Sequence, residues 1–181
     1  MNRQMHDASR STAFIVCGSP GAGKTTYGQR LSRERSAVFL DIDTVTERIV
    51  QAGLKLAGQS PNDRDSPTFK QAFRQPIYDT LFDIARENLA WCDVVMTGPF
   101  TTEIRNPNWL VDLGDRLQHS VEVHYVCCEP EVRRQRLIDR GNPRDRPKLE
   151  DWPTYLQYYG AEHPPACPHV HIDTSDADVT G

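Results

Sequence analysis

The residues Gly18-Ser19-Pro20-Gly21-Ala22-Gly23-Lys24-Thr25-Thr26 stand between an apolar run at 13–17 and a helical pattern at 24–35. They fit the pattern G-x-x-x-x-G-K-[ST] in full, in the strand-then-helix setting that this pattern requires. The glycines allow the backbone to turn its N–H groups toward an anion, and the N-terminus of the following helix adds a positive dipole. Lys24 can place its charge beside the β- and γ-phosphates, and the Thr25 hydroxyl can coordinate Mg²⁺. All of these residues together therefore predict a binding site for ATP, or a related nucleoside triphosphate, with Mg²⁺.

Outward from this loop, short apolar runs alternate with helical patterns along the chain. We expect strands at 13–17, 37–40, 93–97, 121–128 and 170–172. We expect helices at 24–35, at 43–52 with an end at Gly53, at 68–91 with a break or kink at Pro76, and at 105–119, 131–140 and 151–160. Continuously apolar strands that alternate with helices are typical of a parallel sheet covered on both faces. The sequence therefore predicts an α/β fold of three layers, with its ligand at the carboxyl ends of the strands.

The chain as a whole has the composition of one globular domain. Of its 181 residues 38% are hydrophobic, and no internal repeat or linker divides them, so we expect a single domain over 1–181 with a flexible tail at 1–11. The net charge of −4 argues against a protein that wraps long nucleic acid. No apolar run approaches the ~20 residues that span a bilayer, and the N-terminus lacks a secretory signal. The odd number of cysteines, 5, suits free thiols, so we expect a cytoplasmic protein.

A phosphate-binding loop occurs in several classes of protein, and the rest of the chain argues against some of these classes. A GTPase would need an Asn-Lys-x-Asp motif that reads guanine, and the chain contains no Asn-Lys pair. A large ATPase would need a longer core and a strand that ends in Asp-Glu, whereas the third apolar run ends in Met96-Thr97-Gly98. Small phosphotransferases remain.

Two carboxylates, Asp41 and Asp43, follow the second apolar run. If the strand continues through both, its period of two points their side chains the same way, beside the phosphate loop. One carboxylate, Asp41, can then serve the Mg²⁺ shell while the other, Asp43, orients an acceptor hydroxyl, and phosphoryl transfer needs both tasks. The alternative is that Asp41 only ends the strand and Asp43 only caps the next helix.

An arginine-rich segment lies in the last third of the chain, with Arg133, Arg134, Arg136, Arg140, Arg144 and Arg146. We expect Arg133, Arg136 and Arg140 to share one helix face. Residues 144–147 follow a Gly-Asn-Pro turn and are expected to form a loop, within a short lid at about 138–150. Arg133 and Arg134 are expected to be a solvated basic surface. At least two of the other four arginines are expected to contact ATP.

These motifs together resemble the small P-loop kinases of the adenylate, shikimate and gluconate kinase type. The chain looks most similar to the AAA_33-type predicted kinases, which also resemble polynucleotide 5′-kinases and zeta-toxin kinases, over roughly 13–175. The resemblance implies a five-stranded parallel sheet in the order 2-3-1-4-5, with Asp41 on the metal and Asp43 on the substrate hydroxyl. It also implies adenine stacking on Arg136, with the loop at 172–175 beside the adenine. One alignment puts the γ-phosphate contact on Arg146 and the other puts the lid arginine at Arg140, so both stay candidates.

The resemblance implies an ATP-dependent kinase that phosphorylates a hydroxyl of a small-molecule acceptor, as a monomer or homodimer. Shikimate itself is disfavoured, because Gly98-Pro99-Phe100 replaces a triple-glycine turn and the arginine expected after the two acids is displaced to Arg48. The alternatives are a kinase of nucleotides, nucleotide sugars or 5′-hydroxyl nucleic acid, and an ATPase module without an acceptor. A metal site is a further, less favoured interpretation of the cluster His163, Cys167, His169 and His171.

Overall fold

The computed structural model describes residues 11–64, 66–159 and 163–176; all but the last residue of the expected tail at 1–11 lies outside them. Every described strand belongs to one sheet, in the order β2-β3-β1-β4-β5. All neighbours in it are parallel, which confirms the predicted fold. The strands are β1 (Thr12–Cys17), β2 (Val38–Asp41), β3 (Val94–Thr97), β4 (Ser120–Cys127) and β5 (Val170–Asp173).

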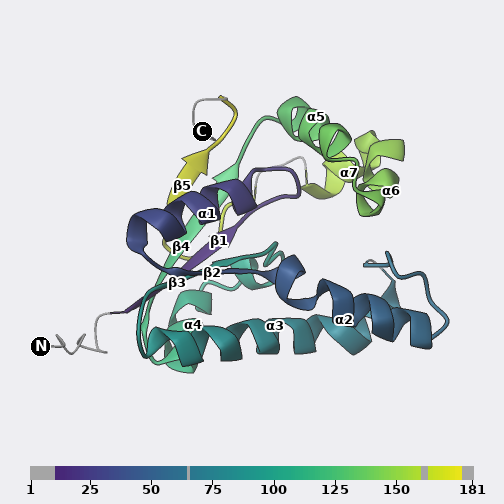
Figure 1. Ribbon diagram of the computed structural model, residues 1–181. Coiled ribbons are helices and arrows are strands. Elements are labelled where there is room, and N and C mark those ends of the chain that lie inside the picture. The colour runs from purple at the N-terminus through teal and green to yellow at the C-terminus, as the bar shows by residue number, and fades with distance from the viewer. Residues whose placement is uncertain (1–10, 65, 160–162, 177–181) are drawn as a thin grey trace, which may run out of the picture.

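Helices cover both faces of this sheet. Helix α1 (Lys24–Arg35) lies on one face, and α3 (Pro67–Leu89) and α4 (Trp109–Leu117) lie on the other (Figure 1). Strand β1 serves both layers, because alternate residues of a strand point to opposite faces. Ala13, Ile15 and Cys17 belong to the core with α3 and α4. Phe14 and Val16 belong to the core with α1.

Helix α2 (Ile42–Leu56) is longer than predicted, since it continues past Gly53. A β-carbon at Gly53 would lie 2.7 Å from the ring of Phe73 in α3. Gly53 therefore permits the close approach of α2 and α3, and does not end the helix.

Helix α3 is one continuous helix, so of the break or kink expected at Pro76 the break is wrong. Pro76 and Ala72, whose carbonyl loses its intrahelical donor, are both exposed, so water can satisfy that carbonyl. In contrast, the helix expected at 105–119 begins later. A single 3₁₀ turn, η2 (Glu103–Arg105), is separated from α4 by Asn106-Pro107-Asn108.

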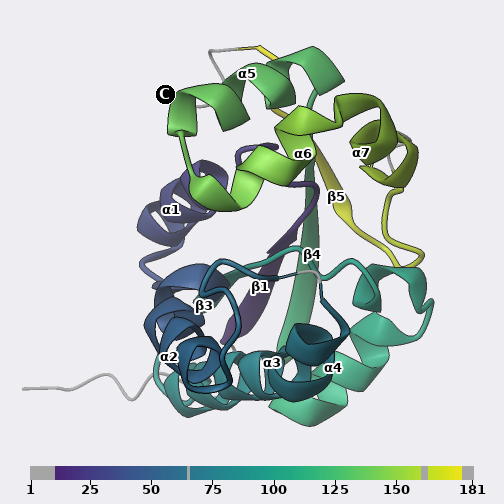
Figure 2. The same cartoon turned by 90° about the vertical axis from the view of Figure 1, so that its right-hand side faces the viewer.

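The helices α5 (Pro130–Arg140), α6 (Arg146–Glu150) and α7 (Trp152–Tyr159) group together at the opposite end of the fold from α2, α3 and α4 (Figure 2). Their shared core contains Leu137, Trp152 and Tyr155. The expectation of a loop at 144–147 is wrong: Gly141 (φ 59°) ends α5, and after Asn142 a 3₁₀ turn, η3 (Pro143–Asp145), leads directly into α6. We call residues 138–150 the lid segment.

The expectation that Arg133 is part of a solvated basic surface is also wrong, because its side chain is fully buried. In the described part of the chain no helix is both long enough and apolar enough to cross a membrane.

Candidate active site

The Gly-rich loop lies between the end of β1 and the start of α1, as predicted. Gly18, Gly21 and Gly23 have φ values of 139°, 82° and 88°, which side-chain-bearing residues rarely adopt. A β-carbon on Gly18 would overlap the carbonyl of Val126 in β4. The glycines therefore allow the loop to fold tightly against β4 and α5, with the N-terminus of α1 beside it.

Lys24 opens α1, and its Nζ donates to the carbonyl of Ser19 within the loop (2.9 Å). Burial lowers the pKa of Lys24 to about 8, although the carboxylate of Asp43 raises it. Burial disfavours the charged form of Lys24, and an anion that binds beside it would stabilise that charge, so the loop is suited to a phosphate group.

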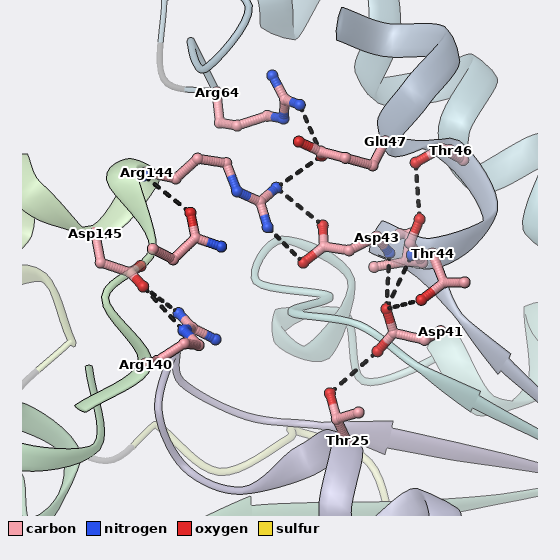
Figure 3. A network of polar contacts seen from close by, with 12 residues as sticks. Thr25, Asp41, Asp43, Thr44, Thr46, Glu47, Arg64, Arg140, Arg144 and Asp145 are labelled. Atoms are coloured by element: carbon pink, nitrogen blue, oxygen red, sulfur yellow. Dashed lines mark hydrogen bonds and ion pairs between the residues drawn. The ribbon is translucent and has the colours of Figure 1, made fainter. Parts of the chain in front are cut away.

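Asp41 is the N-cap of α2 and a junction between three elements (Figure 3). Its Oδ1 accepts from the backbone N–H groups of Asp43 and Thr44, each at 3.1 Å. Its Oδ2 accepts from the hydroxyls of Thr25 (3.1 Å) and Thr97 (2.7 Å). The alternative in which Asp43 caps the helix is therefore wrong.

The oxygens of Thr25 and Asp41 fit Mg²⁺, which prefers hard oxygen ligands and takes only one or two protein groups where phosphates and water supply the rest. No group of three or more His, Cys, Asp or Glu residues that could hold a metal ion occurs in the part of the chain that the structure describes.

Asp43 lies in the first turn of α2, so the expectation that it shares a strand face with Asp41 is also wrong. Instead it faces the lid segment (Figure 3). Arg144 of η3 holds both of its oxygens, with Nη1–Oδ1 at 3.2 Å and Nη2–Oδ2 at 2.9 Å. Partial desolvation would raise the pKa of Asp43, but the hydrogen bonds and charge of Arg144, together with Lys24 and Arg64, hold it below its usual value. The carboxylate is thus ionised at neutral pH.

Glu47, one turn further along α2, joins two arginines at a single oxygen. Its Oε2 accepts from Arg144 Nη1 (3.0 Å) and from Arg64 Nη2 (2.7 Å). The sequence analysis missed Glu47 and Arg64, and it named Arg144 only as one of several arginines. The spacing of four residues between Asp43 and Glu47, which puts both on one helix face, is the signal that could have found Glu47.

The two candidate lid arginines lie apart from Asp43 in this arrangement. Arg140 is paired with the buried Asp145 of its own segment, with Nε–Oδ2 at 3.0 Å. Its positive charge is one of the smaller causes that lower the pKa of Lys24. Arg146 is exposed, and its side chain makes no hydrogen bond or ion pair to any residue that the structure describes.

Arg136 joins α5 to the loop that follows β5. It donates to the hydroxyl (3.0 Å) and the carbonyl (2.6 Å) of Thr174. Thr174 in turn donates from its hydroxyl to the carbonyl of Ala22 in the phosphate loop (2.8 Å). The structure therefore brings together Arg136, residues 172–175 and the phosphate loop.

The turn after β3 is filled by an aromatic ring. Phe100 is fully buried and has a φ of +44°, an unusual conformation for a bulky residue. Its ring packs on Tyr78, Phe82 and Trp109. Phe100 thus fills with a buried aromatic ring the turn that departs from the triple-glycine pattern.

Within the C-terminal cluster of histidines and cysteine, Nδ1 of His169 lies 2.9 Å from the carbonyl of Cys167. Nε2 of His171 lies 3.2 Å from Sγ of Cys127, and His169 and His171 both pack on the ring of Tyr125.

The chain is similar to known proteins over most of its length. The profile of a family described as AAA domain (AAA_33) matches residues 14–161. A shikimate kinase from Bacillus anthracis (strain CDC 684 / NRRL 3495) is 27% identical over 170 residues, which cover 92% of this chain and 91% of that protein. A solved structure from Chloroflexus aurantiacus has a TM-score of 0.66 at 18% identity, with 94% and 88% of the two chains covered. A shikimate kinase from Acinetobacter baumannii, in complex with shikimate, has a TM-score of 0.55 at 20% identity, with 95% and 88% covered. The two solved structures share the fold of this chain.

Proposed function

The chain belongs to the AAA_33 family of AAA domains, and we propose that it is an ATP-dependent kinase that transfers the γ-phosphate of ATP to a hydroxyl group of a small molecule. The similarity to the Bacillus anthracis shikimate kinase supports the general reaction, in which an alcohol accepts the phosphate. The identity of the acceptor is a separate question.

The observation that carries this proposal is the separation of two neighbouring carboxylates into two environments. Asp41 faces Thr25 of the phosphate loop, where a metal bound to ATP belongs. Asp43 faces the lid segment and is ionised. An ATPase without an acceptor needs only the first of these carboxylates, whereas a kinase also needs a group that orients the attacking hydroxyl.

Thr25 and Asp41 are the residues that would hold Mg²⁺, and this ion supplies charge that offsets the phosphates when it is bound with ATP. Lys24 and the N–H groups of the loop would bind the phosphates. We assign the adenine side to Arg136 and keep Arg140 and Arg146 as candidates for the γ-phosphate.

Asp43 would accept the hydrogen bond of the acceptor hydroxyl and orient its oxygen toward the γ-phosphorus. As the new O–P bond forms, the bond between the γ-phosphorus and the bridging oxygen of ADP breaks, and the hydroxyl proton passes to Asp43. Arg144 occupies both oxygens of Asp43, so an acceptor has to share or displace that contact. A small molecule is favoured because Arg144 contacts both Asp43 and Glu47, and Arg64 contacts Glu47 from another side (Figure 3).

The experiment is a transfer screen with γ-labelled ATP and Mg²⁺ against polyols, sugars, hydroxy acids, nucleosides and 5′-hydroxyl oligonucleotides. We expect label in a small hydroxyl compound, and none with Lys24→Ala. Label released only as inorganic phosphate, whatever the compound added, would favour the ATPase alternative.

A further inference from the structure

Two arginines from different segments converge on one carboxylate oxygen in the region where an acceptor would lie. Arg144 comes from the lid segment and Arg64 from the loop before α3, and both donate to Oε2 of Glu47. The side chains of Arg144 and Arg64 are 17% and 18% exposed. Paired guanidinium groups on a carboxylate are how proteins commonly bind acidic ligands, so Glu47 stands where the acid group of such a ligand would bind.

Each member of this group is held in place by further contacts. Glu47 Oε1 accepts from the amide of Gln51 (2.7 Å), which fixes the carboxylate. Arg64 also donates to the carbonyls of Pro61 (3.1 Å) and Asp63 (2.6 Å), so its guanidinium cannot turn easily toward a different anion.

The charges of this group cancel. Asp43 and Glu47 contribute two negative charges, and Arg64 and Arg144 contribute two positive charges, all joined by the contacts above. A ligand carboxylate would have to displace Glu47 and would then add a third negative charge beside Asp43. An uncharged ligand with several hydroxyls would instead find carboxylate oxygens that accept and guanidinium groups that donate hydrogen bonds.

We infer that Glu47 is the specificity-determining residue of the acceptor site, which by holding Arg64 and Arg144 rejects acceptors that carry a carboxylate and selects an uncharged polyhydroxylated one. The inference rests on the proposed kinase function and names the class of its acceptor. Glu47 acts through the two arginines and takes no part in the transfer itself.

The test uses two pairs of probes whose members differ in charge: methyl shikimate with shikimate, and sorbitol with gluconate. Calorimetry measures the binding of each probe to the full chain with Mg²⁺ and a non-hydrolysable ATP analogue. The variant Glu47→Gln keeps the side-chain size and removes the charge, whereas Glu47→Asp keeps the charge. We expect Glu47→Gln to gain about tenfold or more in affinity for the acids, because Arg64 then loses its carboxylate partner and Arg144 keeps only Asp43, so that the group carries a net positive charge. We expect Glu47→Asp to keep the wild-type preference for the uncharged probes.

The control is Asp79→Asn, which removes an ion-paired carboxylate on α3 (2.8 Å from Arg116) away from the lid segment. It should leave the ratio of affinities unchanged. If Glu47→Gln gains no affinity for either acid, or if the wild-type protein binds both members of each pair equally, the inference is overturned. A gain of the same size in Asp79→Asn would also overturn it, because the effect would then come from overall charge. Failure of the proposed function would be seen separately, as absence of phosphate transfer, since this test measures binding alone.

Discussion

Replacing Asp43 by Asn separates catalysis from structure at this site. The substitution keeps the shape of the side chain but removes its charge and its capacity to accept a proton. If Asp43 orients the acceptor hydroxyl, kcat should fall by about 10²–10⁴-fold, the usual contribution of a general base, while ATP affinity is retained. That loss corresponds to about 3–5 kcal/mol of transition-state stabilisation.

The expected effect of Asp43→Asn on stability is small, and the structure gives the reason. The cap of α2 is Asp41, so the helix keeps its N-terminal hydrogen bonds. The ion pair that is lost joins Arg144 to a side chain that is 58% exposed, and such pairs contribute about 0–1 kcal/mol. Glu47 still holds Arg144 in the variant. We therefore expect the melting temperature to change by about 4 °C at most.

The assay is steady-state transfer from γ-labelled ATP to the best acceptor from the screen, with the melting temperature measured in parallel. Asp79→Asn, which also loses one ion-paired carboxylate but lies on α3, should transfer phosphate at the wild-type rate. A fully active Asp43→Asn enzyme would refute the assignment of Asp43 to the acceptor hydroxyl. A melting temperature lowered by more than 10 °C, with proportional loss of ATP binding, would instead show that Asp43 is structural.

Further outcomes are expected at Lys24, at Gly28 and at the assigned metal ligands. Lys24→Ala should abolish transfer without unfolding the protein. The pKa of Lys24 is about 8 in the fold and 10.5 in the unfolded chain, so its charge destabilises the folded protein fully below pH 8. The free energy of unfolding should therefore rise as the pH increases from 8 to 10.5. Denaturation measured across this pH range should show no such rise for Lys24→Ala. Gly28→Ala should lower the free energy of unfolding, measured in urea, by about 1–3 kcal/mol. The reason is that the added β-carbon would lie 2.5 Å from the methyl group of Thr97. Wild-type stability of this variant would mean that α1 can shift away from the sheet at no cost. ATP should raise the melting temperature more with Mg²⁺ than without it. Asp41→Asn should increase the Mg²⁺ concentration needed for this additional shift. Equal shifts of the melting temperature with and without Mg²⁺ would contradict the assigned metal ligands.

Local patterns were sufficient for the phosphate loop and for the strands. The loop is a contiguous motif whose glycines are needed for backbone reasons, so it can be recognised without knowing its neighbours. The parallel sheet follows from short apolar runs between helical patterns, because such strands must be buried on both faces. The same reasoning failed at Gly53 and Pro76. The glycine at position 53 is needed because Phe73 of another helix approaches it closely. Pro76 is tolerated inside α3 because it is exposed to water.

The sequence by itself determined which residue types are present at the phosphate loop, at Asp41 and Asp43 and in the arginine-rich segment, and thereby the class of chemistry. Only the tertiary structure decided which of them meet. Arg144 and Glu47 are 97 residues apart in the chain, and no local periodicity relates them. Arg133 and Arg144 have the same side chain in the same basic segment, yet the fold buries the first entirely and joins the second to Asp43. The partners of a long charged side chain depend on which surfaces pack against its own, and that packing involves the whole chain.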